Sequence, residues 1–230
     1  MIQNRESFLK TLSDKMGRTL RTEPLPVPAP VNDYATTNFT DLDAVGLESL
    51  FLERSAQMLA KTKTTLPENL PAAVAEVARQ YGDKIVLTDD VRLHETGVTD
   101  ALKVGFSDVF VWDHNTPEAS IAKAEAAKVG VVFADYAIAD CGFAVLLSSK
   151  ERARSVSLLP ENNIIVIRRS TILPRVAQLA QILHERAQAG ERMPSCINII
   201  GGPSSTADIE LIKVVGVHGP VTANYIIVED

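Results

Sequence analysis

The feature that most constrains the fold is a repeated alternation of short apolar runs with helical stretches from residue 82 onward. Apolar runs of strand length recur at 85–87, 109–112, 131–133, 164–167, 197–200 and 225–228. Helical stretches are expected between these runs at 98–103, 117–128 and 170–189, and two further helices are expected before them at 46–61 and 72–81. Repeated strand–helix units form parallel sheets with helices on both faces, and the continuous β-branched run at 164–167 is typical of a strand buried on both faces. We therefore predict an α/β fold with a mostly parallel sheet.

One part of the sheet is predicted to be antiparallel. The apolar runs 136–138 and 143–147 are separated by a short turn at Asp140, Cys141 and Gly142. Such a short connection joins antiparallel strands, because parallel strands need a much longer crossover. The sheet is therefore expected to be mixed.

The N-terminal part has a different character. Residues 6–17 are predicted to form a helix with apolar side chains on one face, namely Phe8, Leu9, Leu12 and Met16. Four prolines follow between residues 24 and 30, which excludes a regular helix there and favours an extended tether. We predict an appendage over 1–45 and an α/β domain over 46–230. The first helix packs either on that domain or on a neighbouring subunit of a homo-oligomer.

Charge and hydropathy exclude several classes of partner. The net charge is −6 and the isoelectric point is near 5.3. A nucleic-acid partner is not expected, since neutralising phosphates requires clustered lysine and arginine. Residues 1–20 lack the apolar core of a signal peptide, and no apolar run is long enough to cross a bilayer. We expect a cytoplasmic protein without membrane insertion.

The two cysteines, Cys141 and Cys196, are isolated in the sequence. Neither has a second potential ligand at the spacing of a metal site, which argues against iron–sulfur clusters and structural zinc. No metal and no cofactor is therefore expected.

A first candidate for chemistry is the segment 134–142. Asp135 and Asp140 bracket a predicted strand, and Gly142 permits a tight turn or a close approach of a ligand. A carboxylate at the end of a strand suits general-base or ligand-orienting work. Alternatively, both aspartates are turn residues that bind nearby backbone amides.

A second candidate is the segment 201–210, which is expected to follow a strand and to open a helix. Free backbone N–H groups gather around anions in that setting, and Ser204, Ser205 and Thr206 could donate to a carboxylate or phosphate. Alternatively, Ser205 and Asp208 stand at capping-box spacing, so Asp208 would satisfy the helix end and repel an anion. The segment lacks the lysine of a Walker loop.

A third candidate is His218, which lies between Gly216 and Gly219. These glycines leave the imidazole accessible, and its ordinary pKa suits acid–base work at neutral pH. The alternative is a histidine that fixes the turn before the last strand.

Arg154 ends a cationic stretch that includes Lys150 and Arg152. An arginine there could clamp an anionic ligand, and the alternative is a solvated loop.

Taken in order, these segments resemble the lactate-utilisation protein C family of LUD-domain proteins. The matching residues are 134–142, 154–160 (Arg-Ser-Val-Ser-Leu-Leu-Pro), 202–210 (Gly-Pro-Ser-Ser-Thr-Ala-Asp-Ile-Glu) and 216–220 (Gly-Val-His-Gly-Pro). The resemblance implies a fold like that of the glucosamine-phosphate isomerase, ribose-phosphate isomerase and CoA-transferase group. One departure is Cys141, where the family usually has threonine, so a role that depends on a hydroxyl is in doubt here.

The resemblance also implies a part in the oxidation of L-lactate to pyruvate beside iron–sulfur partner proteins. This chain would be the non-redox component, which binds an anionic metabolite or docks those partners. Asp140, Asp208 and His218 would line its site, and the other ligand-binding residues would be Arg154, Ser204, Ser205, Thr206, Glu210 and Gly219. Asp140 and His218 would be the catalytic groups if the protein is itself an enzyme. The alternative is an independent enzyme that acts on a CoA ester, a sugar phosphate or a folate-like ligand.

Overall fold

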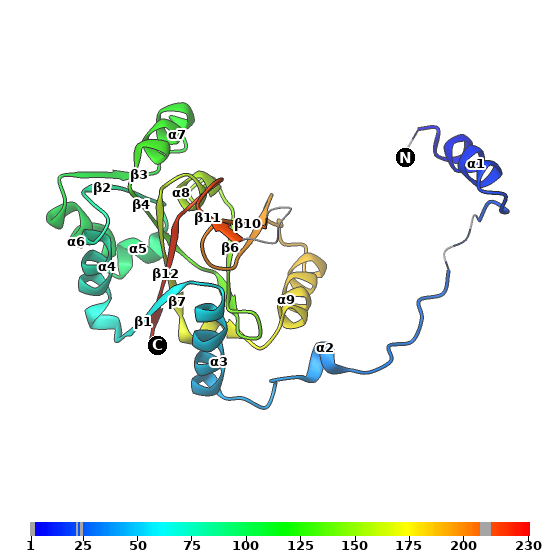
Figure 1. Ribbon diagram of the computed structural model, residues 1–230, viewed down its shortest axis with the longest axis horizontal. Helices are drawn as coiled ribbons and strands as arrows, with labels where there is room; N and C mark the ends of the chain where they lie inside the picture. Colours follow the sequence, from blue (N-terminus) through cyan, green and yellow to red (C-terminus); the bar gives the residue numbers. More distant parts are fainter. Residues whose placement is uncertain (1–2, 22, 24, 208–212) are drawn as a thin grey trace. The chain divides into compact units, whose positions relative to one another are not determined.

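The computed structural model describes residues 3–21, 23, 25–207 and 213–230. Contacts divide the chain into two units, Met1–Asp33 and Tyr34–Asp230. The first unit contains α1 (Arg5–Lys15), which confirms the predicted helix with slightly earlier ends, followed by residues without helix or strand in the described part of 18–33. The second unit carries the sheets (Figure 1).

The larger sheet of the second unit, sheet A, is parallel throughout and has the strand order β1-β12-β7-β4-β2-β3. Its strands are β1 (Lys61–Thr65), β2 (Lys84–Leu87), β3 (Asp108–Val111), β4 (Val129–Phe133), β7 (Asn162–Arg168) and β12 (Thr222–Val228). The continuous apolar run in β7 lies in the interior of the sheet and is buried on both faces, as predicted.

A smaller sheet, sheet B, has the order β8-β5-β6-β9. Its strands are β5 (Tyr136–Ile138), β6 (Phe143–Leu147), β8 (Ile172–Leu173) and β9 (Ile197–Ile200). The antiparallel pairing of β5 with β6 confirms the predicted hairpin, and β9 pairs antiparallel with β6. The predicted mixed character therefore comes from a separate sheet beside the parallel one.

Helices of the second unit cover both faces of sheet A and the far side of sheet B. The helices described in this unit are α2 (Tyr34–Thr37), α3 (Ala44–Gln57), α4 (Leu70–Arg79), α5 (Val91–Glu95), α6 (Val98–Gly105), α7 (Pro117–Ala126), α8 (Arg154–Leu158) and α9 (Val176–Gln188), with single 3₁₀ turns at Pro67–Asn69 and Arg169–Thr171. One face of sheet A packs on α4, α5 and α6, which lie together in Figure 1. The other face packs on α3, α7, α8 and sheet B, and α9 covers the far side of sheet B.

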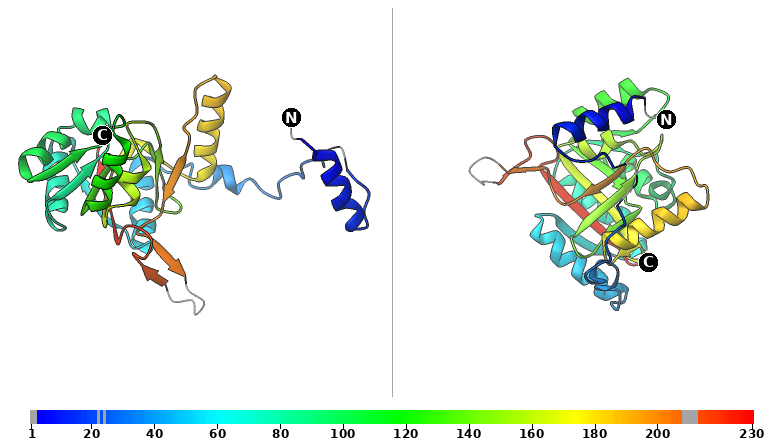
Figure 2. Two further views of the ribbon diagram at one scale, coloured as in Figure 1. Left: turned by 90° about the horizontal axis from the view of Figure 1, so that it is seen from above. Right: turned by 90° about the vertical axis from the view of Figure 1, so that its right-hand side faces the viewer.

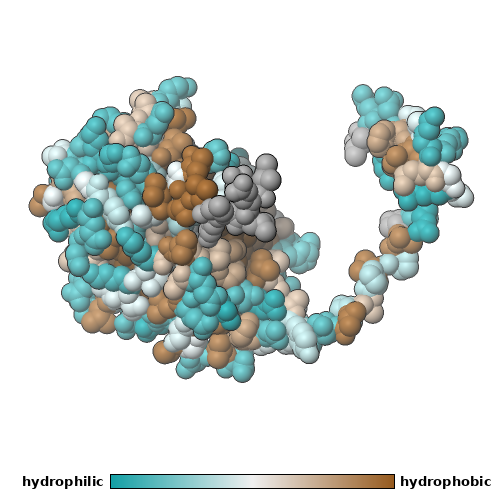
Figure 3. Space-filling view, in the orientation of Figure 1, coloured by the Kyte–Doolittle hydropathy of each residue, from teal (hydrophilic) through white to brown (hydrophobic). Residues whose placement is uncertain are grey.

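Three local predictions were wrong. The helix expected after Pro203 is instead a two-stranded hairpin, β10 (Ser205–Ala207) with β11 (Lys213–Val215), which projects from the second unit in Figure 2. The helix expected from Ser170 begins only at Val176, because Pro174 lacks the N–H that a helix interior requires. The helix expected over 46–61 ends at Gln57, and β1, which begins at Lys61, was not predicted. The surface of this unit is mostly polar with apolar patches between (Figure 3).

Tyr225 ties sheet A to the segment that follows β9. Its side chain is fully buried, and its hydroxyl accepts a hydrogen bond from Gly202 N at 2.8 Å and donates one to Ile200 O at 2.9 Å. Tyr225→Phe removes the partner of both backbone groups, so we expect the free energy of unfolding to fall by about 1–3 kcal/mol, measured by urea denaturation.

The same residue gives a pH dependence in the alkaline range. Burial raises the pKa of the Tyr225 hydroxyl to about 12, whereas an unfolded tyrosine ionises near pH 10. Between these values the unfolded state binds fewer protons than the folded state, so stability falls as the pH rises from about 10 to 12. The Tyr225→Phe variant should lack this component of the decline, and an identical decline in both proteins would contradict the assignment.

Candidate functional site

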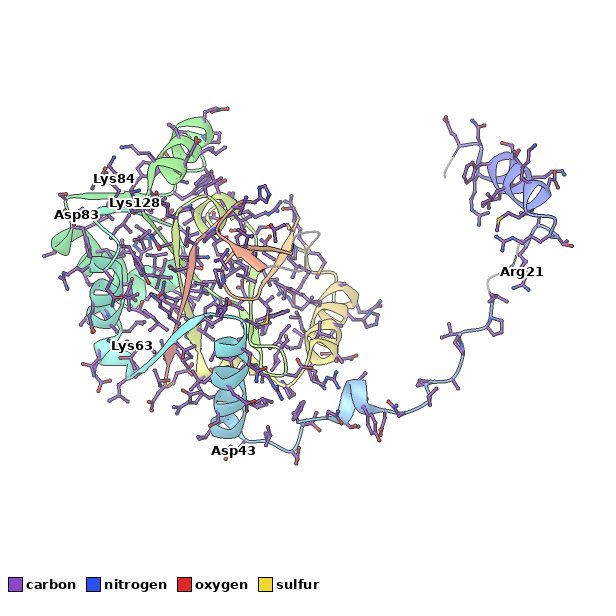
Figure 4. The ribbon with its side chains drawn as sticks, viewed as in Figure 1. Arg21, Asp43, Lys63, Asp83, Lys84 and Lys128 are labelled. Carbon is purple, nitrogen blue, oxygen red and sulfur yellow. The ribbon has the colours of Figure 1, made fainter. Side chains whose placement is uncertain are left out.

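The strand order of sheet A points to the carboxyl ends of β2 and β4. The chain passes from β2 to β3 on one side and then returns to β4 on the other side of β2. Ligands bind in open α/β sheets at such a switch of direction, outside the carboxyl ends of the strands. Lys84 and Lys128, labelled in Figure 4, mark the amino ends of the same two strands, at the opposite edge. A ligand-binding site is therefore expected among the residues that follow Leu87 and Phe133.

The segment after β2 carries a buried ion pair. Asp90 is 4% exposed and caps α5 by accepting a hydrogen bond from the backbone N of Arg92. The Arg92 guanidinium binds the same carboxylate through Nε, at 3.0 Å from Oδ1, and through Nη2, at 2.6 Å from Oδ2. Burial tends to raise the pKa of Asp90, but its hydrogen bonds and charge interaction with Arg92 outweigh burial and hold the pKa below its ordinary value. Asp90 is therefore a buried carboxylate that keeps its charge.

The segment after β4 extends this network. Asp135 Oδ1 lies 2.6 Å from Arg152 Nη1 and 3.3 Å from Arg92 Nη2, while its Oδ2 accepts a hydrogen bond from Leu147 N at 2.7 Å. Arg92 also donates to the backbone oxygens of Phe133 and Ala134. Two arginines and two aspartates thus join the ends of β2 and β4 to the loop after β6.

A narrow cavity lies beside this network. It has a volume of about 20 Å³, which is room for about one water-sized group. Its polar lining comes from Thr88, Asp135, Ser148, Arg152, Arg154, Ser157 and Asn198. Thr88 is 3% exposed, and its buried hydroxyl has no hydrogen-bond partner among the described residues. A buried hydroxyl without a hydrogen-bond partner is unfavourable. A ligand oxygen in this cavity would accept the hydrogen bond that the Thr88 hydroxyl can donate.

The loop that supplies Arg152 is held in place from two sides. Trp112 Nε1 donates to Lys150 O at 2.9 Å, and Asp89 N donates to Glu151 O at 3.1 Å. The Arg152 guanidinium is therefore presented to the cavity by a fixed loop, which lowers the entropy that a ligand would lose on ordering it.

The residues predicted from sequence fall into separate places. Arg154 lines the cavity and donates from Nε to Asn198 Oδ1 at 3.0 Å. Asp140 lies in the β5–β6 turn and pairs with Arg175 at 2.9 Å. His218 is exposed in the loop before β12, and in the described part of the chain no hydrogen bond or ion pair joins it to Asp140. The catalytic roles of Asp140 and His218 stay predictions.

Cys141, in the turn between β5 and β6, is a poor nucleophile. Burial, together with the negative charge of the neighbouring Asp140, raises the pKa of its thiol to about 12. The thiolate is the reactive form of cysteine, so this thiol is essentially unreactive at neutral pH.

The serine-rich segment and the histidine loop are brought together. Ser204 N donates to Pro220 O at 2.9 Å, and Gly216 N donates to Ser204 O at 2.8 Å. A Cβ on Gly219 would lie 3.2 Å from that of Ser204, so the two segments are in close contact. The exposed Ser205 and Thr206 belong to β10, while Asp208 and Glu210 lie outside the described residues. The ligand-binding roles of these residues also stay predictions.

Sequence reasoning missed Thr88, Asp90 and Arg92. A signal was present, since Thr88-Asp89-Asp90-Val91-Arg92 follows directly on the predicted strand 85–87. Polar side chains just after a parallel strand lie at the edge where ligands bind. Asp135 was recognised, but not its pairing with Arg92 and Arg152.

Metal sites and membrane spans are absent from the described residues. They contain no group of three or more His, Cys, Asp or Glu side chains placed to hold a metal ion. No helix among them is long and apolar enough to cross a membrane.

Comparison with known proteins identifies the family. The LUD domain model matches residues 42–228. The chain is 48% identical over 231 residues to the uncharacterized protein YkgG of Escherichia coli (strain K12), and 41% identical over 235 residues to lactate utilization protein C of Halalkalibacterium halodurans, with 100% of each chain covered in both cases. A crystal structure of a DUF162 family protein from Deinococcus radiodurans shares the fold, with a TM-score of 0.56, 18% identity, and coverage of 81% of this chain and 99% of that one. The chain therefore belongs to the lactate-utilisation protein C family of LUD-domain proteins.

Proposed function

We propose that this protein serves L-lactate utilisation as a non-redox component that binds a small carboxylate at the carboxyl ends of β2 and β4. The name of its relatives, lactate utilization protein C, supports the process. The unpartnered Thr88 hydroxyl in a cavity beside Arg152 and Arg154 is the observation that carries the binding site. Oxidation of lactate then belongs to iron–sulfur partner proteins.

The chemistry of the cavity suits a carboxylate head group. One carboxylate oxygen fills the space of about one water and accepts the hydrogen bond that Thr88 leaves unmade. Arginine guanidinium groups bind carboxylates with paired, charge-assisted hydrogen bonds. Asp135 shares the guanidinium of Arg152, so a competing anion must displace or share that ion pair, which favours binding of moderate affinity.

Thermal stability in the presence of L-lactate, pyruvate and D-lactate tests this proposal. A bound acid at about 100 times its dissociation constant should raise the free energy of unfolding by about 2.7 kcal/mol. Thr88→Val removes the hydroxyl and keeps the shape, so affinity should fall about tenfold, which corresponds to roughly 1.4 kcal/mol.

The matched control is Thr99→Val. The Thr99 hydroxyl is also fully buried without a partner, but it lies in α6, on the opposite face of sheet A, and does not line the cavity. Ligand binding should be unchanged in this variant. Equal losses in both variants, or no stabilisation by any acid, would refute the carboxylate site. Turnover of a CoA ester or a sugar phosphate by the isolated protein would instead favour an independent enzyme.

A further inference from the structure

A basic groove lies next to the cavity on the side of sheet B. It has a volume of about 500 Å³ and is lined by four cationic side chains, namely Lys150, Arg152, Arg186 and Arg192, against the one acidic side chain of Glu151. This local excess of positive charge stands on a chain whose net charge is −6. The groove therefore favours negatively charged partners, although the protein as a whole is negatively charged.

Two of these cations are available to a partner. Arg152 is engaged by Asp135 and Arg186 by Glu191, at 2.6 and 2.7 Å. Lys150 meets Glu151 at 3.4 Å with its side chain 68% exposed, and Arg192 is exposed and forms no ion pair with the described residues. Among the described residues Arg192 thus carries a charge without an ion-pair partner, and Lys150 is an exposed cation that is paired with Glu151 alone.

The groove leads directly into an unpaired strand edge. Its residues Arg192 to Ser195 run into β9, which is the outermost strand of sheet B. No strand of the described residues pairs with the outer side of β9. Ile197 and Ile199 are 36% and 44% exposed along this edge. An edge strand with exposed apolar side chains and no charged residue of its own is a template for pairing with another strand.

We propose that the basic groove and the edge of β9 together dock an extended acidic segment of a partner protein. The segment adds a strand to sheet B through main-chain hydrogen bonds, its apolar side chains cover Ile197 and Ile199, and its carboxylates reach Lys150 and Arg192. Charge complementarity selects this occupant over a second copy of the chain, which would bring further arginines to the edge. This surface shares four residues with the carboxylate cavity, namely Leu147, Ser148 and Arg152 of the groove and Asn198 of β9, and is otherwise separate from it.

A labelled peptide of about twelve residues with alternating glutamate and valine is the probe, and the lysine–valine peptide is its control. Fluorescence anisotropy should show binding of the acidic peptide alone, weakening with added salt because exposed charges are screened. Reversing the two exposed cations, Lys150→Glu with Arg192→Glu, should lower the affinity for the acidic peptide at least about tenfold. Ile199→Ser should weaken it without changing the charge of the protein.

Hydrogen exchange locates the peptide. The backbone amides of Ile197 and Ile199, which face away from β6, should gain protection when the acidic peptide is bound, a change that a purely electrostatic encounter would not produce. A matched charge reversal at the amino edge of sheet A, Lys84→Glu (labelled in Figure 4), should leave the affinity unchanged. Binding that is the same in the doubly reversed variant, or that leaves β9 unprotected, would overturn the proposal.

Self-association is the competing outcome. A dimer in sedimentation experiments, with the amides of β9 already protected in the absence of peptide, would assign the edge to a second copy and overturn the acidic partner. Stabilisation by L-lactate measured in the same variants separates the two proposals. If L-lactate stabilises the protein but the acidic peptide does not bind, only the docking proposal is refuted. If the peptide binds but L-lactate does not stabilise the protein, only the carboxylate site is refuted.

Discussion

Replacing Arg92 by methionine is expected to lower the free energy of unfolding by about 3–5 kcal/mol, because it leaves a buried carboxylate without its counter-charge. Asp90 is almost fully buried and takes three of its hydrogen bonds from this one guanidinium. The same group bonds two backbone oxygens at the end of β4 and lies 4.7 Å from the ring centre of Phe133. One substitution therefore disconnects the ends of β2 and β4.

Urea denaturation measures the loss, and a surface ion pair provides the control. Arg186→Met removes the same type of side chain from Glu191, where both partners are partly solvated. Exposed pairs contribute about 0–1 kcal/mol, so this variant should be nearly as stable as the parent. A loss below about 1 kcal/mol for Arg92→Met would show that Asp90 is solvated or protonated in the variant at little cost.

Gly142→Ala is expected to destabilise the protein by about 3 kcal/mol more than Gly190→Ala. A Cβ at position 142 would lie 2.3 Å from Ser55 N and 2.6 Å from the carbonyl carbon of Arg54, both in the backbone of α3. A backbone cannot rotate away as a side chain does, so the β5–β6 turn must move off the helix. The positive φ of 68° adds the cost of a left-handed conformation for alanine.

Gly190 is the matched control for that substitution. Its φ of 78° is also left-handed, but a Cβ there would have nothing within 4 Å. Gly190→Ala therefore measures the backbone cost alone, about 1 kcal/mol. Urea denaturation of both variants isolates the close approach to α3, and equal losses would contradict it.

The α/β fold was predictable because its central strands are apolar on both faces. Buried runs such as those of β4 and β7 stand out in a sequence, and the short Asp140–Gly142 connection is enough to predict the β5–β6 hairpin. Strand β1 was not predictable in the same way. Its sequence, Lys-Thr-Lys-Thr-Thr, is polar because β1 lies at the edge of sheet A, where only one side is paired. Edge strands carry this kind of charge to avoid unwanted pairing.

The candidate site was only partly predictable. Asp135, Arg152 and Arg154 were noticed as single residues, but nothing in their spacing shows that the loop after β6 returns to the end of β4. That return depends on the packing of sheet B against sheet A, which is a tertiary contact between distant segments. The helix expected after Pro203 failed for a related reason. A capping pattern is a local signal, and pairing between Thr206 and Val214 outweighs it.

The position of β12 in sheet A determines when the sheet can be completed during synthesis of the chain. This strand lies between β1 and β7, so Lys61 and Asn224 are neighbours although 163 positions separate them. While the ribosome is still making the earlier strands, β1 has no partner and β7 keeps one side open. Such long-range pairing is slow and leaves strand edges exposed to aggregation. Closure of sheet A is therefore a late, all-or-none event that waits for residues 222–228, and slowing translation just before them should prolong the chain's need for chaperones.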